Sequence, residues 1–98
     1  MTQQYLAGEL SLLLARLQAV ATDQASARHI ACLRREAETG PLTALSSLTA
    51  RALALTDALC WQSLQRGSTA AFTRQSTICA ELWDFGVCAG LLKEDDLL

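Results

Sequence analysis

The fold is decided by residues 41–65, PLTALSSLTARALALTDALCWQSLQ. Leucine and alanine recur here at spacings of three and four, which place side chains on one face of an α-helix. Two neighbouring rows result, one of Leu45, Leu48, Ala52, Leu55 and Leu59, the other of Leu42, Leu53, Cys60 and Leu64. Arg51 and Asp57 are the only formal charges. We therefore expect this helix to lie at the centre of the fold or to touch partners on more than one side.

Glycines mark both ends of this stretch. Gly40-Pro41 precedes it and Gly67-Ser68 follows it. Glycine is favoured just past a helix end, while proline and serine are favoured where the next helix begins. A further helix is predicted from residue 69 to residue 85 or 88, with one face made of Phe72, Cys79, Leu82 and Trp83 and flanked by Ile78 and Phe85. Gly86 and Gly90 are expected to weaken its end.

The first forty residues predict two more helices. Residues 2–21, capped by Thr2, carry a regular row of Leu6, Leu10, Leu13, Leu14, Leu17 and Ala21. If that helix continued, Arg28 and Arg35 would fall within the leucine row. We therefore predict a break near Thr22-Asp23, where either residue can cap a second helix over residues 24–38. That helix is the most polar of the four.

Composition supports an all-α fold. The 98 residues include 19 leucines and 17 alanines, but only four valines and isoleucines together. Leucine and alanine favour helices, whereas β-branched residues favour sheets. The prediction is one domain over residues 1–92, an up-down-up-down four-helix bundle with short connections, and an acidic tail over residues 93–98. The alternative is a pair of helical hairpins that completes its core only as a dimer.

The chain is more apolar than an average soluble domain. It is 51% hydrophobic and 18% charged, against about 25% charged in average domains. The excess apolar surface predicts a homodimer or another protein partner. A net charge of −2 argues against binding to nucleic acid or to an anionic membrane.

The cellular location that we predict depends on the absence of long apolar segments. The longest uncharged stretch, residues 39–50, has twelve residues, whereas a membrane-spanning helix needs about 20. No basic segment precedes the first charge, Glu9, so no secretory signal is expected. We predict a cytoplasmic protein with its four cysteines as thiols. Arginine outnumbers lysine seven to one, which we interpret as the codon bias of a GC-rich bacterial genome.

No motif predicts catalysis, a cofactor or a metal. The cysteines Cys32, Cys60, Cys79 and Cys88 lack C-x-x-C spacing, and the pattern favours buried thiols over zinc ligands. His29 is the sole histidine. Although it can share a helix face with Cys32, a surface histidine is the simpler interpretation. No Glu-x-x-His pair and no glycine-rich phosphate loop is present.

The best partner-binding residue is Trp61. It falls outside both leucine rows, at the end of a strip of small residues, Ala50, Ala54 and Ala58. Small residues let another helix approach closely, and tryptophan is a common interface anchor. The basic residues Arg28, Arg34 and Arg35 form a second candidate surface. The function predicted is a non-enzymatic protein-interaction or regulatory module.

Two alternatives involve other residues. Asp57 lies in an apolar helix, so a buried Asp57 needs a partner. We expect an arginine from residues 24–38; otherwise Asp57 is a ligand-binding carboxylate. With Cys60, Cys79 and Trp83 it would serve a small-molecule or metal-binding bundle. The weaker alternative is a DNA-binding regulator that reads bases through residues 73–77, TRQST.

Overall fold

The computed structural model describes residues 3–92 and shows an all-α fold. Its helices are α1 (Gln3–Ala19), α2 (Gln24–Thr39), α3 (Leu45–Gln65) and α4 (Thr69–Cys88), with one 3₁₀ turn, η1 (Leu42–Ala44), before α3. The third helix thus begins later than predicted, because the chain after Pro41 first forms the 3₁₀ turn. The predicted cap at Thr2 and the acidic tail lie outside the described residues.

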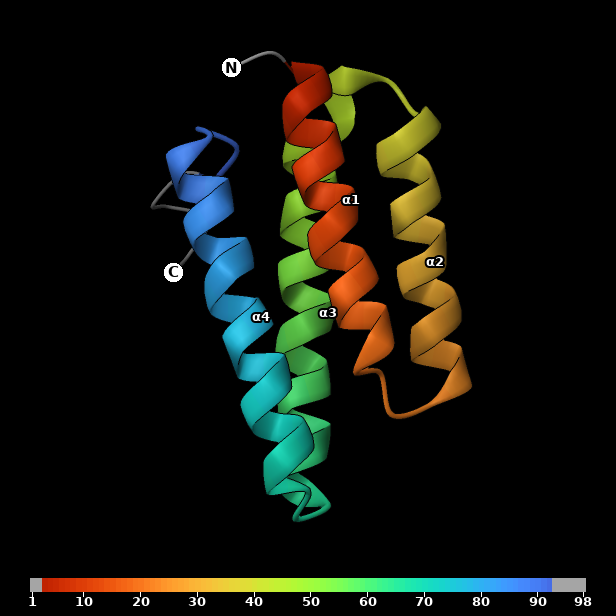
Figure 1. Ribbon diagram of the computed structural model, residues 1–98, viewed down its shortest axis with the longest axis vertical. Helices are drawn as coiled ribbons and strands as arrows, with labels where there is room; N and C mark the ends of the chain where they lie inside the picture. The colour runs from red at the N-terminus through yellow and green to blue at the C-terminus, as the bar shows by residue number, and fades with distance from the viewer. Residues whose placement is uncertain (1–2, 93–98) are drawn as a thin grey trace.

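The helices pack in pairs. α1 packs chiefly against α2 and α3 against α4, while α1 also contacts α4. Successive helices run in opposite directions, with α2 and α4 at opposite edges of the view and α1 in front of α3 (Figure 1). The Cα positions span 40 × 27 × 16 Å. The molecule is therefore thin, and much of each helix lies near its surface.

The core contains the leucine row predicted for α1 and most of the first row predicted for α3, whereas Leu64 of the second row is exposed. Its fully buried large side chains are Leu10, Leu14 and Leu17 of α1, Ile30 and Leu33 of α2, Leu45, Leu48 and Leu59 of α3, and Leu82 of α4. Fully burying such a side chain contributes about 1.5–3 kcal/mol. The break before α2 is also confirmed, because the Asp23 carboxylate accepts hydrogen bonds from the backbone N–H and the hydroxyl of Ser26.

The predicted face of α4 is only partly correct, since Leu82 and the flanking Ile78 are buried but the other members are not in the core. The buried residues of this helix are Gln75, Ile78, Leu82 and Gly86. Leu82 is the only member of the predicted face inside the core, whereas Phe72 and Cys79 are half-buried and Trp83 is exposed. Apolar residues occur nearly all around α4, so their periodicity alone left its orientation ambiguous.

A polar side chain takes the core position because its hydrogen bonds are satisfied. The Gln75 amide donates to the carbonyl of Val20 at 3.0 Å, and its oxygen accepts from the Ser63 hydroxyl at 2.7 Å. Buried polar groups are tolerated when they are paired in this way. These two bonds connect α4 to α3 and to the end of α1.

Two glycines end helices in the left-handed conformation. Gly67 has φ 74° and Gly90 has φ 72°. At each, the residue after the glycine donates to a carbonyl five positions earlier: Ser68 to Ser63 at 2.9 Å and Leu91 to Gly86 at 2.8 Å. This is the Schellman motif, which stops a helix and reverses the chain. Gly40 is not left-handed, with φ −80°, although its N–H still bonds the carbonyl of Glu36.

Candidate functional site

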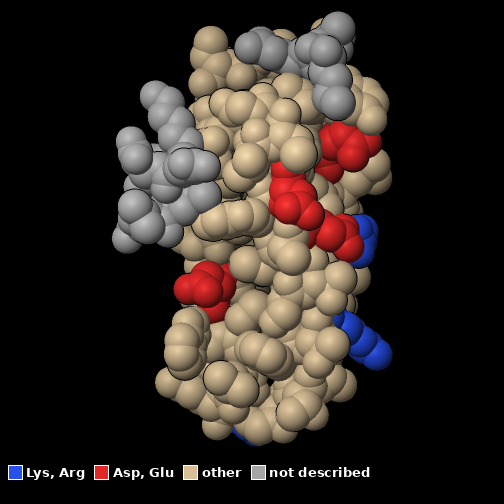
Figure 2. All heavy atoms as spheres, turned by 90° about the vertical axis from the view of Figure 1, so that its left-hand side faces the viewer, with Lys and Arg blue, Asp and Glu red and all other residues tan. Residues whose placement is uncertain are grey.

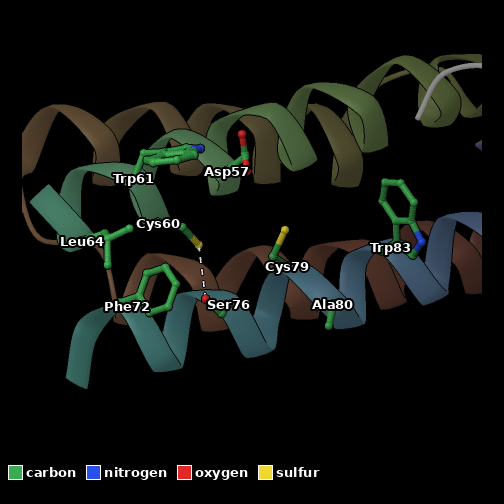
Figure 3. Close-up of a pocket in the computed structure, with 9 residues that line it drawn as sticks. All are labelled: Asp57, Cys60, Trp61, Leu64, Phe72, Ser76, Cys79, Ala80 and Trp83. Carbon is green, nitrogen blue, oxygen red and sulfur yellow. Dashed lines mark hydrogen bonds between the residues drawn. The ribbon is translucent and has the colours of Figure 1, made fainter. Parts of the chain in front are cut away.

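A groove with a volume of about 570 Å³ lies between α3 and α4. From α3 it is lined by Asp57, Cys60, Trp61 and Leu64, and from α4 by Phe72, Ser76, Cys79, Ala80 and Trp83. No residue of α1 or α2 lines it. Figure 3 shows Trp61 and Leu64 opposite Phe72, with Trp83 at the other end of the groove. We call these nine residues the α3–α4 groove.

Sequence spacing explains how the two helices build this groove. Asp57, Trp61 and Leu64 are separated by four and three residues, so they lie along one face of α3. Phe72, Ser76, Cys79 and Trp83 follow the same rule on α4. The Schellman turn at Gly67 folds α4 back along α3. Two apolar strips are thereby set side by side.

The two tryptophans stay largely accessible. Trp61 is 59% exposed and Trp83 is 39% exposed. A tryptophan side chain has a large apolar area, and burying that area would stabilise the fold. Two tryptophans that stay in contact with solvent contribute less of this stabilisation. Exposed large apolar side chains gathered in one place are typical of a binding surface.

The floor of the groove carries two thiols. Cys60 is buried, with its Sγ 3.8 Å from the hydroxyl oxygen of Ser76. In Figure 3 the sulfurs of Cys60 and Cys79 both point into the space between the helices. Burial raises the pKa of the Cys79 thiol, and electrostatic interactions with Cys60 and Asp57 raise it further. Cys79 is therefore held as a neutral thiol, which is a weak nucleophile.

Asp57 does not have the predicted arginine partner. Its side chain is exposed and it forms no ion pair with any residue from 3 to 92. The charge pair between α2 and α3 has the opposite arrangement, with Arg51 on α3 and Glu36 on α2, 3.0 Å apart. Asp57 is instead the only charged residue that lines the groove.

The other residues predicted to bind a partner lie on two different helices, α3 and α2. Ala50, Ala54 and Ala58 are exposed on α3 but do not line the groove. Arg28 and Arg35 are exposed on α2, and Arg34 donates to the Gln18 side chain at 3.0 Å. Since α2 lies at the far edge of the molecule from α4 (Figure 1), the structure does not bring these arginines to Trp61.

The structure also shows where the residues named for the alternative functions lie. Gln75, from the run predicted to read DNA bases, is buried, and the hydroxyls of Thr73 and Thr77 bond carbonyls of their own helix. Across residues 3–92, no three His, Cys, Asp or Glu side chains are gathered as a metal site would require. None of the helices in the described part of the chain has both the length and the hydropathy of a transmembrane span.

Sequence reasoning singled out five of the groove residues but did not place all five at one site. Asp57, Cys60, Cys79 and Trp83 were grouped as a ligand-site alternative, while Trp61 was assigned to a partner surface. Leu64 and Phe72 were placed on apolar helix faces, Ser76 was part of the run predicted to read DNA bases, and Ala80 gave no signal beyond its spacing. In comparisons with known proteins, no protein-family model, no curated protein and no solved structure matches this chain.

Proposed function

We propose that this protein is a non-enzymatic interaction module that binds a helical segment of another polypeptide in the α3–α4 groove. The observation that carries the proposal is the uncovered pair of apolar strips on two adjacent helices, flanked by Trp61 and Trp83. An amphipathic helix laid into such a groove buries its own apolar face together with that of its host. Accessible tryptophans are frequent anchors of such interfaces.

The chemistry of the groove lining supports binding as the proposed role. Its one carboxylate is exposed, and its Cys79 thiol is held neutral. A nucleophile needs an adjacent base, and the histidine, His29, lies on α2 outside the groove. These features favour binding over chemistry.

Site-specific photocrosslinking in the native host tests the proposal. A photoreactive residue in place of Ala80 is expected to crosslink to a defined polypeptide, whereas one in place of Thr73, exposed on α4 outside the groove, is expected not to. Adding Trp61→Ala to the Ala80 variant should suppress the crosslink. Equal crosslinking from both positions, or a crosslink that survives Trp61→Ala, would contradict the proposal. A product of twice the chain mass identifies a homodimer, which remains a prediction of the composition.

A second candidate is a small-molecule binding bundle. It is favoured by one observation: Asp57, Cys60, Cys79 and Trp83 do line a single hollow of about 570 Å³, within the usual range of ligand sites, about 300–1,000 Å³. Native mass spectrometry on freshly purified, reduced protein distinguishes the two. A monomer that carries additional mass, lost in a Trp83→Ala variant, supports the small-molecule function.

A further inference from the structure

The groove has an unbalanced negative charge. Glu36 pairs with Arg51, Glu81 pairs with Arg16, and Asp23 caps α2. Asp57 has no such partner within residues 3–92, and none of the residues that line the groove is basic. Figure 2 looks onto the α4 side and shows several acidic groups, with basic groups only towards its margins. An occupant of the groove would therefore meet one anionic group in apolar surroundings.

The aromatic side chains beside Asp57 suit a cation that has an apolar stem. Trp61 follows Asp57 by one helical turn, while Phe72 and Trp83 come from the opposite wall. Aromatic faces attract ammonium and guanidinium groups, and lysine and arginine stems pack on apolar surface. The same occupant must also present apolar side chains, because the rest of the lining, apart from the Ser76 hydroxyl, is leucine, alanine and thiol.

A second copy of this chain fits the groove poorly. A two-fold axis through the groove would bring two Asp57 carboxylates together with no basic residue between them. The basic helix of the chain, α2, exposes Arg28 and Arg35, but its large apolar residues Ile30 and Leu33 are buried in the core. Neither arrangement supplies both a cation and apolar anchors.

We infer that the groove recognises a cationic amphipathic helix of a different polypeptide, with a lysine or arginine at Asp57 and apolar side chains between Trp61 and Trp83. This inference rests on the proposed function. The lining on α4 runs from Phe72 to Trp83, which is about 16 Å at the α-helical rise. The bound segment therefore spans about three helical turns, with apolar residues at spacings of three and four.

Two synthetic peptides test the charge preference. Both are amphipathic helices of about 15 residues, or four turns, with identical leucine positions and no tryptophan. The polar face is lysine in one and glutamate in the other. Because the protein has two tryptophans and both line the groove, its intrinsic fluorescence reports directly on occupancy. The Leu–Lys peptide is expected to shift the emission at concentrations where the Leu–Glu peptide does not.

Variants of the protein test whether Asp57 is the charge that selects the lysine peptide. Asp57→Asn should weaken Leu–Lys binding by up to about fivefold, as expected for an ion pair at an exposed position, and Asp57→Lys should reverse the preference between the peptides. Asp84→Asn is the matched control, because it removes the same charge from an exposed position on α4 outside the groove. Since Asp57 is exposed, none of these variants should change the helical circular dichroism.

Equal binding of the two peptides, or equal weakening by Asp57→Asn and Asp84→Asn, would overturn the inference. If both peptides bind equally and Leu64→Ala weakens both, the groove binds apolar helices without charge selection, and the proposed function stands alone. If neither peptide changes the fluorescence or the hydrogen exchange of α3 and α4, the proposed function fails as well. A dimer that protects α3 and α4 and excludes both peptides assigns the groove to a second copy.

Discussion

The side-chain amide of Gln75 donates a 3.0 Å hydrogen bond to the backbone carbonyl of Val20, joining α4 to the end of α1. Since the Gln75 oxygen also accepts from buried Ser63, Gln75→Leu leaves two polar groups without their partner. Each such group costs about 1–3 kcal/mol, so we expect a loss of about 2 kcal/mol or more in the free energy of unfolding, measured with urea. Ser63→Ala should recover part of it. Gln62→Leu, at an exposed position on α3, should have little effect.

Two leucines of α3 provide a matched test of the core. Leu59 is 1% exposed and Leu64 is 49% exposed. Leu59→Ala should lower the free energy of unfolding by about 2–5 kcal/mol, as large-to-small core substitutions do, whereas Leu64→Ala should lower it by less than about 1 kcal/mol. Chemical unfolding of both variants checks the orientation of α3. Similar losses would mean that the core row has been misplaced.

Gly86 and Leu92 should be energetically coupled. A Cβ added to Gly86 would lie 2.3 Å from Cδ1 of Leu92, so Gly86→Ala must displace that side chain. Overpacking of this kind costs about 1–3 kcal/mol and outweighs the gain in helix propensity. In a Leu92→Ala background the same substitution should cost clearly less. A double-mutant cycle measures the difference, and additive effects would rule out the contact.

Asp23 should make stability depend on pH. Hydrogen bonds from the backbone and hydroxyl of Ser26 lower the pKa of Asp23 below its ordinary value of 3.8. A group with a depressed pKa stabilises the fold above its ordinary pKa, and that contribution is lost as pH falls through the folded-state pKa. The stability difference between the wild type and Asp23→Ala should therefore be constant near neutral pH and shrink below about pH 4. Thermal unfolding from pH 7 to pH 2 tests this, with Asp84→Ala as the control.

The four thiols should react in a fixed order. Cys32 and Cys88 are exposed, Cys60 is buried, and burial raises the pKa of Cys79. Because the thiolate is the reactive form, iodoacetamide at mildly alkaline pH should label Cys32 and Cys88 before the two groove cysteines. Peptide mass spectrometry gives the order. Early labelling of Cys79 would show that the groove opens more than the structure indicates.

The sequence predicted most of the fold because leucine periodicity is unambiguous in α1 and α3. Leu10, Leu14 and Leu17 form a regular row, and all three are buried. The break before α2 followed from the mismatch between this row and the arginines. The 3₁₀ turn after Pro41 could not be predicted, because the same residues also suit an α-helix.

The site was only partly predictable, since it depends on how α4 is rotated. Gln75 is buried because partners on two other elements satisfy it, and a sequence read one helix at a time does not show such partners. With Gln75 inward, Phe72 and Trp83 turn outward to form the groove with Trp61. Trp61 is the one residue of the predicted partner surface that lines the groove, and its juxtaposition with residues of α4 required the tertiary structure.

The pairwise packing of the helices also bears on how the chain reaches its fold. Each of the two closest pairs, α1 with α2 and α3 with α4, is joined by a short connection. Closing a short loop costs little chain entropy, and topologies dominated by local contacts fold on the microsecond-to-millisecond scale. The first hairpin can therefore form during synthesis, before α4 has left the ribosome. We expect the contacts between the two hairpins to form last, among them the bond between Gln75 and Val20, which are 55 positions apart in the sequence.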